Sequence, residues 1–156
     1  MNHKDTKTQR ASISQEVNSL SREVVDAAYR VHSALGPGLL ESVYEICLLH
    51  ELEKRDLPVR RQVVVPVVYD GVQLDAGLRL DLFVQDSLVV EVKAVEALLP
   101  VHKAQLLTYL KLAGLRIGLL INLNVPSDPG WDQKGHPMKP LCLCVFVVKK
   151  SWTSHD

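Results

Sequence analysis

Charged side chains interrupt two apolar segments near the middle of the chain. Asp81 lies within Leu80–Val84, and Glu91 and Lys93 lie within Val89–Lys93. Burying an unpaired carboxylate or ammonium group is costly, so these groups need one another or a cation. Two carboxylates that meet offer oxygen ligands to Mg²⁺ or Mn²⁺, and a neighbouring lysine can orient or deprotonate an attacking water. A structural salt bridge from Asp81 or Glu91 to Lys93 is the alternative interpretation.

The register between the two segments decides whether the three charges meet. Glu91 and Lys93 are two residues apart, so they share one face of a strand. Asp81 joins them only if an odd number of loop residues separates the strands. Pairing of Val84 with Leu88 satisfies this condition and sets Asp81 opposite Glu91. We predict this register.

Two helical segments add further polar residues. Glu41 lies in the first turn of a helix, where the helix dipole favours an acid, and Tyr44 follows on the same side. In a later helix Gln105 and Tyr109 are four residues apart and share one face, with His102 in the preceding turn. A helix-start glutamate and a solvated polar stripe are the simpler interpretations of these residues taken alone.

Hydrophobic periodicity predicts the elements that must position these residues. Helices are expected from Leu20, with Ser21 as N-cap, to Leu35, then over 39–55 and 100–113. Strands are expected over 59–69, 72–74, 77–85, 87–94, 116–123 and 141–149, with an Asp70-Gly71 hairpin turn and a loop over 125–140. We expect an α/β layer fold with a mixed sheet, in which a flexible arm (1–19) precedes one domain (20–150) and a tail (151–156).

Composition limits the classes of function. The chain has 156 residues, which suits one domain. Lys plus Arg and Asp plus Glu both number 18, so the formal charge is zero and the strong positive field of many nucleic-acid binders is absent. A nucleic-acid site is therefore expected to be a local patch. Basic residues that could contact phosphates are Lys54, Arg55, Arg60, Arg61, Lys103 and Lys111, although Lys54 and Arg55 are more simply a solvated helix end.

Segment lengths and cysteine usage indicate the cellular setting. No apolar stretch approaches the roughly 20 residues needed to cross a bilayer, so a membrane protein is excluded at this stage. The polar N-terminus shows no secretory signal, and the cytoplasm is the expected location. Cys47, Cys142 and Cys144 form an odd set, so we expect reduced thiols and no disulfide framework, with a metal-binding Cys-x-Cys pair as the minor alternative.

The motifs resemble a known family when they are taken together. Gly38-x-x-Glu41-x-x-Tyr44, preceded by Leu35-Gly36-Pro37, resembles the signature of the GxxExxY proteins. Leu80-Asp81, Glu91-Val92-Lys93 and the run from His102 to Leu110 follow in order, so the resemblance covers about residues 21–125. That family is similar to a small branch of the PD-(D/E)xK nuclease superfamily.

The resemblance implies a restriction-endonuclease-like core, with a mixed β-sheet that contains an antiparallel three-stranded meander and is flanked by helices. It implies that Asp81 and Glu91 bind Mg²⁺ (or Mn²⁺), that Lys93 is the catalytic lysine, and that Glu41 is an extra acid and metal ligand. Gln105 and Tyr109 resemble a Gln-x-x-x-Tyr element that helps hold the site and the nucleic acid. Further candidate nucleic-acid contacts are Tyr44, His102, Lys103, Arg60 and Arg61.

The first hypothesis is a Mg²⁺- or Mn²⁺-dependent nuclease that hydrolyses phosphodiester bonds, with DNA favoured over RNA. The alternative is a non-catalytic module of the same fold that binds a protein or nucleic-acid partner. A degenerate member is expected to have lost Asp81, Glu91 or Lys93, and all three are present. A chain this short has little surface for sequence recognition, so we expect weak specificity or a homodimer. The segment 126–140, with Trp131 and His136, has no assigned role.

Overall fold

The structure, a computed structural model, describes residues 3–126 and 144–149, with side chains described over 15–126. Its elements follow the expected order. The helices are α1 (His3–Leu35), α2 (Glu41–Glu53) and α3 (Pro100–Ala113). The strands are β1 (Val59–Val64), β2 (Val67–Tyr69), β3 (Val72–Leu74), β4 (Arg79–Val84), β5 (Leu88–Lys93), β6 (Ile117–Asn122) and β7 (Cys144–Lys149).

The first helix is longer than the sequence pattern predicted. α1 begins at His3, so the predicted start near Leu20 is wrong, and residues 3–19 are helical where an arm was expected. Val17 and Leu20 are buried and continue the three-and-four spacing that leads to Val24. The residues before them include Lys, Gln, Arg and Glu, which are good helix formers, so their polarity did not indicate the absence of a helix. The domain limits 20–150 stay a prediction.

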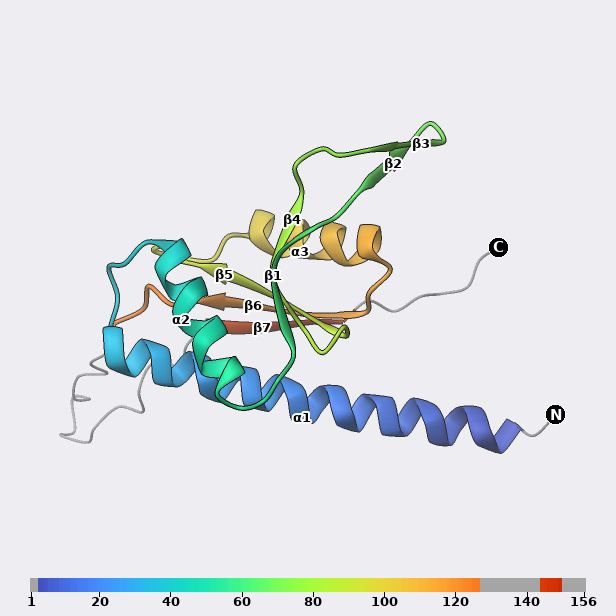
Figure 1. Cartoon of the computed structure of the whole chain (residues 1–156), viewed down its shortest axis with the longest axis horizontal. Helices are drawn as coiled ribbons and strands as arrows, with labels where there is room; N and C mark the ends of the chain where they lie inside the picture. Colours follow the sequence, from blue (N-terminus) through green and yellow to red (C-terminus); the bar gives the residue numbers. More distant parts are fainter. Residues whose placement is uncertain (1–2, 127–143, 150–156) are drawn as a thin grey trace.

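The main sheet is mixed, as expected. Its strand order is β1-β4-β5-β6-β7, with β5 and β6 parallel and the other neighbours antiparallel. The antiparallel meander of β1, β4 and β5 is therefore confirmed. Strands β2 and β3 form the predicted hairpin at Asp70-Gly71, but they make a separate two-stranded sheet that projects from the body of the molecule (Figure 1).

The helices cover both faces of the main sheet (Figure 1). Apolar residues of α1 and α2 pack on one face, against side chains such as Leu82 and Val90. Leu106 and Leu110 of α3 pack on the other face. There α3 comes so close to β6 that a Cβ added at Gly118 would lie 2.8 Å from Leu106 Cδ1. Within the described ranges 3–126 and 144–149, no helix has the length and apolarity to cross a membrane.

Candidate active site

The candidate site lies where strands β4 and β5 separate. The two strands pair from Val84↔Leu88 to Leu82↔Val90, which confirms the predicted register. Beyond this point β4 and β5 no longer pair with each other. Strand β4 stays paired with β1, and strand β5 stays paired with β6. The split therefore opens at the next pair of positions, which are those of Asp81 and Glu91.

The two carboxylates bridge the split. The Val92 backbone N–H donates to Asp81 Oδ2 at 2.9 Å, and the Asp81 N–H donates to Glu91 Oε1 at 3.3 Å. Backbone groups that lose their ladder partners where strands part need other partners, because an unpaired buried N–H is costly. Each carboxylate thus accepts a hydrogen bond from the opposite strand, which fixes the two acids side by side.

Burial changes the protonation of this pair. Glu91 is only 4% exposed, and burial together with the nearby charge of Asp81 raises the pKa of Glu91 to about 9. Burial also raises the pKa of Asp81, although the hydrogen bond from Val92 acts in the opposite direction. Two carboxylates in a low-dielectric setting disfavour each other's charge, and a bound cation would relieve both effects.

Lys93 and Glu41 act on this pair through their charges. The positive charge of Lys93 lowers the pKa of both Asp81 and Glu91, while the charge of Glu41 raises the pKa of Asp81. Glu91 and Lys93 alternate with buried residues of β5 and share the face on which Val89 packs towards α3. Among the side chains of residues 15–126, no ion pair joins Lys93 to Asp81 or Glu91, so the salt bridge of the alternative interpretation is not formed.

The donor set suits a hard divalent cation. Asp81 and Glu91 supply carboxylate oxygens held by the backbone, and Mg²⁺ commonly takes one or two protein carboxylates while keeping several waters. In the part of the chain that the structure describes, no three His, Cys, Asp or Glu residues gather closely enough to hold a metal. The expected third ligand, Glu41, therefore lies within electrostatic range of Asp81 without completing a group of three acids.

Two other predicted site residues lie together on α3. Gln105 Nε2 donates to Tyr109 Oη at 2.9 Å, which confirms that the pair shares one helical face. Tyr109 also packs on the core cluster between α3 and the sheet. His102 accepts a hydrogen bond at Nδ1 from the Leu99 N–H at 3.0 Å, so this side chain caps the start of α3. A nucleic-acid contact by exposed Lys103 stays a prediction.

The role expected for Tyr44 as a nucleic-acid contact is wrong. The side chain is 0% exposed. Its hydroxyl donates to the Gly36 carbonyl at 2.5 Å and accepts from the Leu39 N–H at 3.2 Å. Tyr44 lies in the first turn of α2 on the side that faces the core, and its ring packs among apolar side chains there. Tyr44 therefore holds the turn that precedes Glu41.

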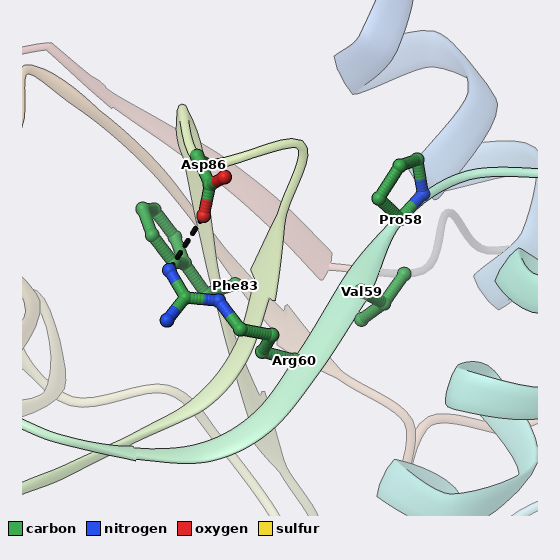
Figure 2. Close-up of a pocket in the computed structure, with 5 residues that line it drawn as sticks. All are labelled: Pro58, Val59, Arg60, Phe83 and Asp86. Carbon is green, nitrogen blue, oxygen red and sulfur yellow. Dashed lines mark hydrogen bonds and ion pairs between the residues drawn. The ribbon is translucent and has the colours of Figure 1, made fainter.

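Arg60 is engaged at the far end of β4. It pairs with Asp86 at 2.5 Å and lies over the Phe83 ring, 5.1 Å from its centroid. With Pro58 and Val59 these residues line a shallow pocket of about 210 Å³ near the β4–β5 turn (Figure 2). This pocket lies away from the split between the strands, and its charges are already paired.

Arg61 is paired with a buried acid that sequence reasoning missed. Glu45, on α2, is 4% exposed, and its Oε1 accepts from Arg61 Nε at 2.7 Å and from Gln62 Nε2 at 2.8 Å. The signal available in the sequence was the position of Glu45 three residues before buried Leu48, on the core-facing side of α2. Because Arg61 already neutralises Glu45, it is a weaker candidate for binding phosphate than its charge alone suggested.

Comparisons with known proteins agree with this architecture. A family model described as the PD-(D/E)XK nuclease superfamily matches residues 18–134, which is more than half of the chain. The α/β fold with its mixed sheet and flanking helices is consistent with a restriction-endonuclease-like fold. Neither the curated proteins nor the solved structures gave a significant match.

Proposed function

The chain belongs to the PD-(D/E)XK nuclease superfamily, and we propose that it is a metal-dependent nuclease that hydrolyses phosphodiester bonds, with DNA preferred over RNA. Within the superfamily we place it in the GxxExxY branch, on the motif Gly38-x-x-Glu41-x-x-Tyr44. The observation that carries the proposal is the pairing of Asp81 and Glu91 at the split between β4 and β5.

In this proposal Asp81 and Glu91 hold Mg²⁺ or Mn²⁺ through their carboxylate oxygens. The ion, when bound, would polarise the phosphoryl oxygen and lower the pKa of a water. Lys93 acts from the same strand face as Glu91, where its Nζ orients the attacking water. Among the side chains of residues 15–126, Lys93 forms no ion pair that would occupy its ammonium group, which supports this assignment.

Three further residues support the site. Glu41 contributes a negative charge beside Asp81, which strengthens the attraction of the site for a cation. Gln105 and Tyr109 form a hydrogen-bonded pair on α3, on the side of the sheet towards which Glu91 and Lys93 project. We propose that this pair contacts the nucleic-acid backbone, since both groups keep hydrogen-bonding capacity.

Calorimetry and cleavage on the same samples test this function. We would measure Mn²⁺ binding to the wild type, Asp81→Ala and the control Asp70→Asn, and assay cleavage of labelled single-stranded DNA, double-stranded DNA and RNA. Asp70 is exposed at the hairpin turn with φ near 52°, a conformation that asparagine tolerates, so the control should match the wild type.

Metal-dependent cleavage by the wild type and the control, with binding and cleavage lost in Asp81→Ala, is the expected result. Binding by the wild type without cleavage of any substrate would favour the non-catalytic module instead. Equal Mn²⁺ affinity in the wild type and Asp81→Ala would refute the site itself.

A further inference from the structure

A short segment at the end of β6 joins three parts of the chain. Asn122 is 1% exposed, and its amide makes two hydrogen bonds with the backbone of Val95. Its Nδ2 donates to the Val95 carbonyl at 2.8 Å, and its Oδ1 accepts from the Val95 N–H at 3.1 Å. The Leu123 N–H donates to the Lys93 carbonyl at 2.9 Å. The backbone that follows Lys93 at its exit from β5 is therefore attached to the end of β6.

The next two residues reach the other side of the site. Asn124 Oδ1 accepts from the Gly38 N–H at 2.9 Å, three residues before Glu41. The Asn124 N–H in turn donates to Asn122 Oδ1 at 3.2 Å. Buried His32, near the end of α1, donates from Nε2 to the Val125 carbonyl at 2.7 Å. The four residues 122–125 thus contact the end of β5, where Lys93 lies, and the turn that precedes Glu41.

The turn before Glu41 depends on such contacts. Helix α2 has Leu40 at its N-cap, with no side-chain hydrogen bond to cap the first turn. Gly38 has φ near +99°, a conformation that favours glycine, and a glycine restrains the backbone less than any other residue. Tyr44 holds the turn from the core through Gly36 and Leu39, and Asn124 holds it from the segment that follows β6.

We infer that Asn122 and Asn124, here called the asparagine clasp, are positioning residues that hold Glu41 in fixed relation to Lys93. The proposed function gives neither asparagine a role in binding metal or substrate. The clasp rests on the proposed function, because it acts through Glu41 and Lys93. Hydrogen bonds that orient the residues of a metal site typically contribute about 10–100-fold to affinity or activity.

A double-mutant cycle tests whether Asn124 acts through Glu41. The variants are Asn124→Ala, Glu41→Gln and the pair together, with kcat, KM and Mn²⁺ affinity measured for each. We expect Asn124→Ala to lower kcat or Mn²⁺ affinity by about tenfold, with KM for DNA nearly unchanged. In the Glu41→Gln background the same change should have almost no further effect, because coupled residues are not additive.

A conservative variant separates positioning from folding. Asn124→Asp keeps the oxygen that accepts from Gly38, so it should restore most of the activity lost in Asn124→Ala. Asn124 is partly exposed, and its substitution is therefore a gentler change than one at buried Asn122. Multiplicative effects of Asn124→Ala and Glu41→Gln, or failure of Asn124→Asp to restore activity, would overturn the inference.

Amide hydrogen exchange provides a readout that does not depend on cleavage. Exchange at the Gly38 N–H should be faster in Asn124→Ala than in the wild type, and unchanged in Asn124→Asp and Glu41→Gln. Unchanged exchange at Gly38 in Asn124→Ala would overturn the clasp even if the protein is an active nuclease. A different result would be a wild type that neither binds Mn²⁺ nor cleaves nucleic acid, although exchange at Gly38 behaves as expected. That result would refute the proposed function and, with it, the positioning role of the clasp. The hydrogen bond from Gly38 to Asn124 would still be confirmed.

Discussion

Replacing Glu91 with glutamine is expected to stabilise the metal-free protein at neutral pH while abolishing tight cation binding. The folded protein holds a proton on Glu91 up to a pKa of about 9, whereas the unfolded chain releases it near the ordinary value of 4.5. The folded state therefore binds more protons than the unfolded state between these values, and the free energy of unfolding falls as pH rises. The amide of the Glu91→Gln variant is neutral at every pH, so the variant should not show this loss.

The size of the effect follows from the same two values. At about 1.4 kcal/mol per pH unit, the rise from 4.5 to pH 7 removes about 3 kcal/mol of stability from the wild type. Glutamine keeps the oxygen that accepts from the Asp81 N–H, so the bridge across the split is retained. Glu91→Gln should thus be more stable than the wild type by about 3 kcal/mol at pH 7, with little difference below pH 4.5.

Urea unfolding between about pH 4.5 and 8, with a chelator present, measures this difference. The control is Glu53→Gln, the same chemical change at an exposed position of α2. Mn²⁺ at about 100 times its Kd should then stabilise the wild type by about 2.7 kcal/mol and leave Glu91→Gln nearly unchanged. The free energies of unfolding of the wild type and Glu91→Gln should differ more at about pH 8 than at about pH 5. A difference that does not grow over this range would show that the fold does not raise the pKa of Glu91.

Three other substitutions test separate parts of the structure. Lys93→Met should keep Mn²⁺ affinity within about threefold by calorimetry but lower kcat by about 10²-fold or more, since the proposed role of Lys93 is to orient the attacking water; equal losses of both would contradict that role. Gly118→Ala should cost about 1–3 kcal/mol in urea unfolding, because its Cβ would lie 2.8 Å from Leu106, and Gly118→Ala with Leu106→Ala should cost less than the sum of the two. Glu45→Gln should cost about 1–3 kcal/mol, because Arg61 loses a charged partner, and no loss in thermal or urea unfolding would show that the pair is dispensable.

The sequence by itself determined most of the local structure and the central pair of acids. Asp81 and Glu91 could be set opposite each other because strand alternation and a short turn are local properties. The charges inside apolar segments also signalled a site, since buried charges need partners. The order of the helices and strands also followed from hydrophobic periodicity, which is a local property of the sequence. The polar start of α1 was missed because the residues there, although good helix formers, lack a strong apolar stripe.

Only the tertiary structure decided how the site is completed. Beyond Leu82 and Val90, β4 and β5 stop pairing with each other, while β4 stays paired with β1 and β5 stays paired with β6. Pairing between segments far apart in the chain leaves no local sign in the sequence. The burial of Tyr44 and the hydrogen bonds of Asn122 and Asn124 likewise depend on which segments fold against one another. The type of a polar residue determines which hydrogen bonds it can form, but the packing of elements far apart in the chain determines which partner it meets.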